Sequence, residues 1–176
     1  MPQHSDWIPM RWPSGPLELA LAGSPSPETR EANEAWHKPG SLAFLENSPV
    51  NCILVTWSAD REEDAAQQRT LAPLLAQAQK QGIAVVGKVS SDREPDFASA
   101  KAAGLSAVWL EGAFGGTFER TPELPVILAA APGKSRPSVN SEILGISKAL
   151  WPRVPVKWTG KTGDAKERAV AAVAAG

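Results

Sequence analysis

Glu111 is the residue of this sequence whose type and position are best suited to chemistry. It follows an apolar run at residues 105–110 and precedes a stretch that contains Gly112, Gly115 and Gly116. A carboxylate at the end of a buried strand acts as a general acid or base when apolar surroundings raise its pKa. Cleavage of a glycosidic bond requires two such carboxylates, one on each side of the bond. Glu111 is therefore a candidate acid/base residue, and the sequence does not identify its second carboxylate.

Five further residues are expected around Glu111 because each ends or follows an apolar run. The carboxyl ends of parallel strands meet at one edge of a sheet or one mouth of a barrel, where substrates bind. We expect all five to bind substrate, and the two tryptophans also to provide the apolar surroundings. The structural alternative for Glu111 is a buried ion pair with a neighbouring lysine. The five residues are Trp57, Asp60, Lys88, Trp109 and Lys148.

The glycine-rich stretch, Gly112 to Gly116, has two interpretations. Glycine lets backbone N–H groups approach a phosphate, so this stretch together with Lys88 could bind an anion. The simpler interpretation is a turn without a ligand. Residues 160–162 (GKT) resemble the end of a phosphate-binding loop, yet Pro155 stands where that motif requires glycine. The sequence has no HExxH pair, no paired cysteines and no GxSxG motif. We therefore expect no metal and no cofactor.

Alternating apolar runs and amphipathic segments predict the elements that position these residues. Residues 1–16 carry four prolines and are expected to be irregular. Glu18 is expected to point inward from the first strand. In the long helix, Leu71, Leu74, Leu75 and Ala78 share one face, Pro73 predicts a kink or a later start, and Gly82 predicts a left-handed cap. Strands are predicted at residues 17–22, 52–57, 83–89, 105–111, 125–130 and 143–146, and helices at 28–38, 60–81, 96–103 and 165–174, with a helical turn at 41–47.

This alternation is typical of an α/β fold with a parallel sheet and right-handed crossovers. An open doubly wound sheet of the dinucleotide-binding kind lacks its GxGxxG signature here. A complete (β/α) barrel takes about 250 residues, whereas this chain has 176. We therefore expect one domain over residues 1–176, a parallel (β/α) barrel that is incomplete, with about six strands of a TIM barrel.

The composition excludes several classes of protein. Lys plus Arg total 18 against 19 for Asp plus Glu, so no basic excess suggests a nucleic-acid or anionic-membrane partner. The first dozen residues lack the apolar core of a signal peptide, and no run approaches the roughly 20 apolar residues that span a bilayer. We expect a soluble protein, cytoplasmic by default. Cys52, the single cysteine, excludes an internal disulfide and is expected to be a small buried hydrophobe.

Four segments together resemble the N-terminal part of bacterial TIM-barrel proteins of the glycoside-hydrolase-like kind. They are residues 11–19 (RWPSGPLEL), 48–58 (SPVNCILVTWS), 63–82 (EDAAQQRTLAPLLAQAQKQG) and 105–112 (LSAVWLEG). The resemblance implies a barrel that acts on a sugar or oligosaccharide, with the acid/base glutamate at the end of strand four and the nucleophile at the end of strand seven. Glu111 matches the first of these positions.

Two alternatives to a glycosidase stay open. The family usually has asparagine before its strand-four glutamate, whereas this chain has Leu110, which favours a non-catalytic carbohydrate-binding barrel. A phosphate-ligand barrel enzyme that uses the loop from Gly112 to Gly116 is the other. A six-strand barrel would also leave two open sheet edges, so self-association through these edges is expected.

Overall fold

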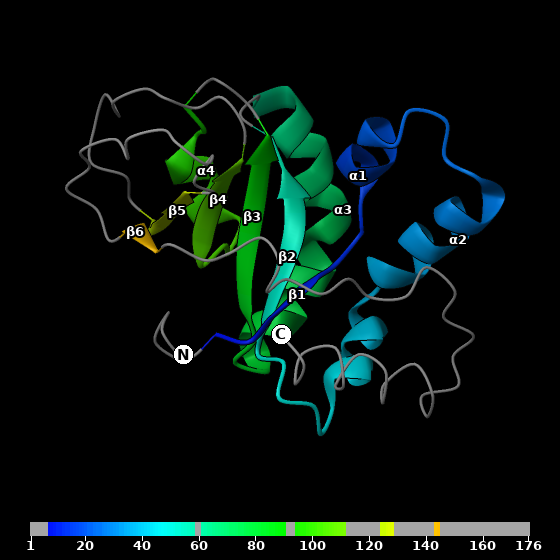
Figure 1. The fold of residues 1–176 in the computed structure, drawn as a ribbon, viewed down its shortest axis with the longest axis horizontal. Coiled ribbons are helices and arrows are strands. Elements are labelled where there is room, and N and C mark those ends of the chain that lie inside the picture. The colour runs from blue at the N-terminus through cyan, green and yellow to red at the C-terminus, as the bar shows by residue number, and fades with distance from the viewer. Residues whose placement is uncertain (1–6, 59–60, 91–93, 112–123, 129–142, 145–176) are drawn as a thin grey trace, which may run out of the picture.

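The computed structural model describes residues 7–58, 61–90, 94–111, 124–128 and 143–144. Asp60, Lys148, the glycine-rich loop and the helix predicted at residues 165–174 lie outside this part of the chain. The described residues form an α/β fold around one six-stranded parallel sheet, in which the strands follow one another in sequence order (Figure 1). The strands are β1 (Pro9–Arg11), β2 (Cys52–Trp57), β3 (Ala84–Ser90), β4 (Ala107–Glu111), β5 (Val126–Leu128) and β6 (Ile143–Leu144).

Most helices of the structure begin and end within two residues of the predicted bounds. Ser26 caps α2 by accepting a hydrogen bond from the Thr29 N–H at 3.2 Å. Gly82 follows α3 with φ of 69°, the left-handed conformation predicted for it. Pro73 lies inside α3, so the expectation of a later helix start is wrong. The helices are α1 (Pro16–Leu21), α2 (Pro27–Trp36), the 3-10 helix η2 (Pro39–Leu45), α3 (Arg61–Lys80) and α4 (Phe97–Ala102).

The strand predicted at residues 17–22 is wrong, because this segment is the helix α1. Leucine, glutamate and alanine are strong helix formers, and Pro16 occupies the first helical turn, where its missing N–H costs nothing. The first strand is instead β1, in the proline-rich region that was expected to be irregular. Pro9 is tolerated there because β1 lies at the edge of the described sheet and pairs with β2 alone. The number of strands before Glu111 is unchanged, so Glu111 still ends the fourth strand.

The two faces of the sheet differ in what covers them. Ile53, Val55 and Trp57 of β2 point to the face covered by helices, where they join the buried face of α3 and the aromatic residues of α2 and η2 in one hydrophobic cluster. Cys52 and Leu54 point to the opposite face and belong to a second, smaller cluster with residues of β3, β4 and β5. Helices that follow successive strands onto one face are the result expected when strand order is sequential and every crossover is right-handed.

No helix within the described residues combines the length and the apolar character needed to cross a membrane.

Candidate functional site

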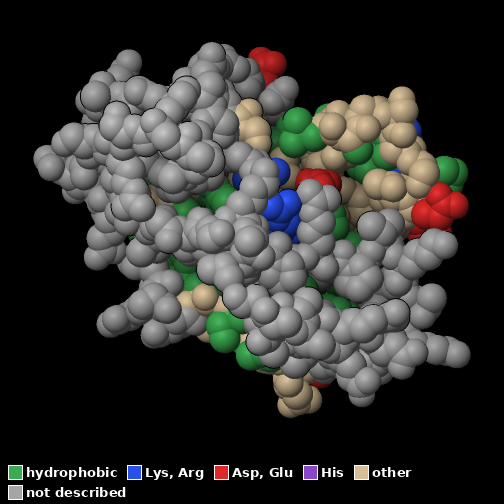
Figure 2. Space-filling model, viewed as in Figure 1, with side chains coloured by type: hydrophobic (Ala, Val, Ile, Leu, Met, Phe, Trp, Pro, Cys, Tyr) green, Lys and Arg blue, Asp and Glu red, His purple; other side chains and the backbone are tan. Residues whose placement is uncertain are grey.

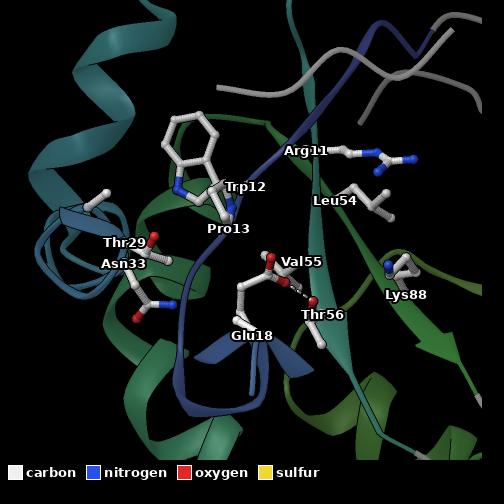
Figure 3. A pocket seen from close by; sticks show the side chains of 12 residues that line it. Arg11, Trp12, Pro13, Glu18, Thr29, Asn33, Leu54, Val55, Thr56 and Lys88 are labelled. Carbon is white, nitrogen blue, oxygen red and sulfur yellow. Dashed lines mark hydrogen bonds between the residues drawn. The ribbon is translucent and has the colours of Figure 1, made fainter. Parts of the chain in front are cut away.

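A cavity of about 280 Å³ lies beside the carboxyl ends of β1, β2 and β3 (Figure 3). Arg11 ends β1, Thr56 is the penultimate residue of β2, and Lys88 lies near the end of β3. Glu18 enters the cavity from α1, and residues of α2 line another side. The described wall thus combines two cations, one carboxylate, two threonine hydroxyls, one amide and apolar side chains.

Glu18 is fixed by Thr56. The Thr56 hydroxyl donates a hydrogen bond to Glu18 Oε2, across 38 residues of sequence (Figure 3). Thr56 is 4% exposed, whereas Glu18 is half-buried. Among the described residues, no donor reaches the second carboxylate oxygen, Oε1. A carboxylate accepts through both oxygens, so Glu18 retains acceptor capacity on a cavity wall.

The buried amide of Gln67 holds α1 in place beneath this carboxylate. Gln67, on α3, is 0% exposed. Its Nε2 donates to the Ser14 carbonyl at 3.0 Å and to the Thr56 carbonyl at 2.9 Å, and its Oε1 accepts from the Leu17 N–H at 3.1 Å. One side chain therefore ties the segment before α1, the first turn of α1 and the end of β2 to the long helix.

A second buried amide fixes the turn between β1 and α1. Asn33 Oδ1 accepts from the Gly15 N–H at 3.2 Å, and Asn33 Nδ2 donates to the Gly15 carbonyl at 3.0 Å. Gly15 has φ of 89°, and a Cβ there would lie 2.3 Å from Gln67 Oε1. Glycine is required both for the backbone conformation and for the close approach of Gln67. Glu18 is therefore presented from a rigid turn.

An aromatic cluster supports the wall of the cavity. Trp12, immediately after β1, is 1% exposed, and its Nε1 donates to the Trp36 carbonyl at 2.8 Å. The rings of Trp12 and Trp36 meet edge to face with centroids 4.7 Å apart, and Phe44 packs against both. Such buried edge-to-face contacts fix ring positions. Trp12 lines the cavity, so this part of its wall is preformed.

The charges of the described cavity wall are of both signs. Arg11 and Lys88 extend from strands on either side of β2, and Glu18 faces the same space from α1 (Figure 3). Basic and acidic side chains also lie close together near the centre of the molecular face seen in Figure 2. Such a wall disfavours a cationic ligand, and it offers both hydrogen-bond donors and a hydrogen-bond acceptor to a ligand.

Trp57 and Trp109, which were predicted to lie together beside Glu111, point to opposite faces of the sheet. Trp57 pairs with Val89 and is 2% exposed in the cluster beneath the helices. Trp109 pairs with Lys88 and is 0% exposed in the cluster of the other face. Side chains alternate between faces along a strand, so the one-residue offset in register separates the two rings.

Two other predicted site residues, Lys88 and Glu111, lie on strands of the described sheet. Lys88 lines the cavity, as an arrangement at the strand ends requires. Glu111 ends β4 and pairs with Ser90, but its side chain lies outside the described part of the chain. Whether these residues bind or transform a ligand stays a prediction.

Four residues around the cavity were not predicted from the sequence: Arg11, Asn33, Thr56 and Gln67. Glu18 was predicted to point inward from a strand, whereas it extends from the helix α1. The available signal was the proline- and glycine-rich segment at residues 11–19, because a turn of that composition directly after a strand is where binding residues gather.

Comparisons with protein-family models, with curated proteins and with solved structures found no match. The described residues contain no group of three or more His, Cys, Asp or Glu side chains able to hold a metal ion. Cys52 is buried, and its desolvation raises the pKa of the thiol far above the ordinary value. In the folded chain Cys52 is therefore a thiol and not a nucleophilic thiolate.

Proposed function

We propose that this protein is an incomplete (β/α) barrel that acts on a carbohydrate at the carboxyl ends of its strands, with Glu111 as candidate acid/base. The sequential parallel order of the strands and the helices on one face support the barrel. Sites of such barrels lie at the carboxyl ends of the strands, which is where the cavity opens. The resemblance of four segments to glycoside-hydrolase-like barrels supports the same assignment.

The observation that carries the proposal is the mixed-sign lining of the cavity. Arg11 and Lys88 disfavour a cationic ligand, and Glu18 places a hydrogen-bond acceptor beside these two donors. Hydroxyl groups both donate and accept hydrogen bonds, so a neutral polyhydroxylated ligand suits a wall that carries both kinds of group. Ligand pockets usually measure about 300–1,000 Å³, and a cavity of about 280 Å³ suits one sugar ring.

The test combines binding and turnover. The wild-type protein is titrated with the methyl glycosides of D-glucose, D-galactose, D-mannose and D-xylose, and is assayed with the matching nitrophenyl glycosides. Glu111→Gln is expected to retain binding and to lose roughly 10²- to 10⁴-fold in rate, the usual contribution of a general acid or base. Glu46→Gln, an exposed glutamate outside the cavity, is the matched control.

The results separate the alternatives. Binding without turnover of any nitrophenyl glycoside would favour the non-catalytic carbohydrate-binding barrel. Equal rates for wild type and Glu111→Gln would remove Glu111 from the mechanism. The absence of both binding and turnover would contradict the proposal as a whole.

A phosphate-ligand enzyme is the second candidate, because Arg11 and Lys88 line the same cavity. A ligand that binds the folded state raises the melting temperature by mass action. Inorganic phosphate and glycerol phosphate that raise the melting temperature of the wild type, but not that of Lys88→Gln, would support this candidate.

A further inference from the structure

We propose that Glu18 is the carboxylate that accepts the hydroxyl hydrogens of the sugar in this cavity, and that Glu18 determines which sugar is accepted. This inference rests on the proposed carbohydrate function and assigns it to a residue of α1. The assignment differs from Glu111, which is proposed for the chemistry of bond cleavage.

The first reason is that one oxygen of the Glu18 carboxylate is available to a ligand. Thr56 occupies Glu18 Oε2, and among the described residues no donor reaches Oε1. An ionised carboxylate is an acceptor only, so a ligand must supply the donor. The neighbouring cations Arg11 and Lys88 make an ammonium group a poor donor for this place, whereas a neutral hydroxyl suits it.

The second reason is that hydrogen bonds hold the start of α1, and with it Glu18, in position. Gln67 and Asn33 are buried amides whose hydrogen bonds fix Ser14, Gly15 and Leu17. They hold the turn from which Glu18 extends. A polar group that is already in position before binding loses little entropy when a ligand arrives. The position of Glu18 is thus preorganised, as expected of a residue that recognises a ligand.

Selectivity follows from this arrangement. A site built to bond a hydroxyl rejects the analogue that lacks it, because the polar group of the site is then left without a partner. Removing one particular hydroxyl from the ligand should therefore weaken binding to the wild type strongly. The same removal should have little effect once Glu18 is neutralised.

The experiment titrates wild type, Glu18→Gln and Glu31→Gln by calorimetry with the four methyl glycosides and with the 2-, 3-, 4- and 6-deoxy forms of the tightest binder. Glu31 is an exposed glutamate of α2 and is the matched control. A hydrogen bond to a charged group is worth enough to change affinity by roughly 10- to 100-fold. We expect Glu18→Gln to bind that much more weakly, Glu31→Gln to match the wild type, and one deoxy form to lose affinity for the wild type but not for Glu18→Gln.

Circular dichroism establishes that each variant is folded. If Glu18→Gln does not fold, Glu18→Asp replaces it, since it keeps the charge and withdraws the carboxylate by one methylene, and the same weakening is expected. Unchanged affinity in a folded Glu18 variant would overturn the inference and leave the carbohydrate function standing. No binding of any glycoside by the wild type would overturn both.

Discussion

Replacing Gln67 by leucine should destabilise the fold even though the new side chain is apolar and of similar size. Gln67 is fully buried and makes three hydrogen bonds to backbone groups of Ser14, Leu17 and Thr56. Leucine makes none of them, so two carbonyls and one N–H lose their partner.

The magnitude follows from the count of bonds. A neutral hydrogen bond contributes about 1 kcal/mol net, and a buried group left without a partner costs about 1–3 kcal/mol. Three lost bonds therefore predict a loss of about 3 kcal/mol in the free energy of unfolding of Gln67→Leu. For a chain of this length, 1 kcal/mol corresponds to roughly 2–4 °C in melting temperature, so the loss should lower it by roughly 6–12 °C.

The assay is urea unfolding followed by tryptophan fluorescence, with the slope m compared between variants to establish that the exposed surface is unchanged. Gln79→Leu is the control, because Gln79 is exposed on the same helix and surface changes usually stay within about 0.5 kcal/mol. If Gln67→Leu also stays within about 0.5 kcal/mol of the wild type, Gln67 does not anchor α1 and the reasoning fails.

Three other changes test separate parts of the structure by the same unfolding assay. Gly15→Ala should lower the free energy of unfolding by several kcal/mol, and Gly23→Ala by only about 1–2 kcal/mol. Both glycines have positive φ, but the new Cβ meets Gln67 only at position 15. Equal losses in the two variants would contradict the close approach of Gln67 to Gly15. Cys52 keeps its proton in the folded state at pH values where the unfolded thiol loses it. Above about pH 8.5 the free energy of unfolding of the wild type should therefore fall relative to that of Cys52→Ala, by up to about 1.4 kcal/mol per pH unit. Parallel pH profiles of the two proteins would refute this. Leu74→Ala should cost about 2–5 kcal/mol through the cavity it leaves, and a loss below about 1 kcal/mol would show that α3 does not pack as described.

The elements with strong local patterns could be predicted from the sequence. The apolar run of β2 is buried at every position, and the face of α3 that carries Leu71, Leu74, Leu75 and Ala78 is buried as its spacing predicts. In these segments the local pattern and the tertiary environment favour the same structure, and so the pattern is informative.

The first strand could not be predicted because its local signals conflict with its place in the fold. Prolines argue against a strand, but an edge position removes the objection for Pro9, and edge positions depend on the whole sheet. The segment of α1 alternates weakly, which suits a strand, but is short and made of helix formers. Tertiary context decided between the two.

The cavity could not be predicted because its contacts join distant parts of the chain. Glu18 and Thr56 are 38 residues apart, and Gln67 and Ser14 are 53 residues apart. The face on which a strand residue points depends on register, which the sequence does not specify for Trp57 and Trp109.

The sequential order of the strands also bears on how the chain reaches this structure. Cys52 pairs with Ala84, Val86 with Ala107, and Val108 with Val126, so each of these strands pairs with the strand before it across about 20 to 30 residues of sequence. Loop closure then costs little at each step, and contacts between near neighbours favour fast folding. We therefore expect β2, α3 and β3 to form the earliest structure, because they make the most extensive pairing and share the largest helix. Later strands would then add one at a time, much as units add in a repeat protein.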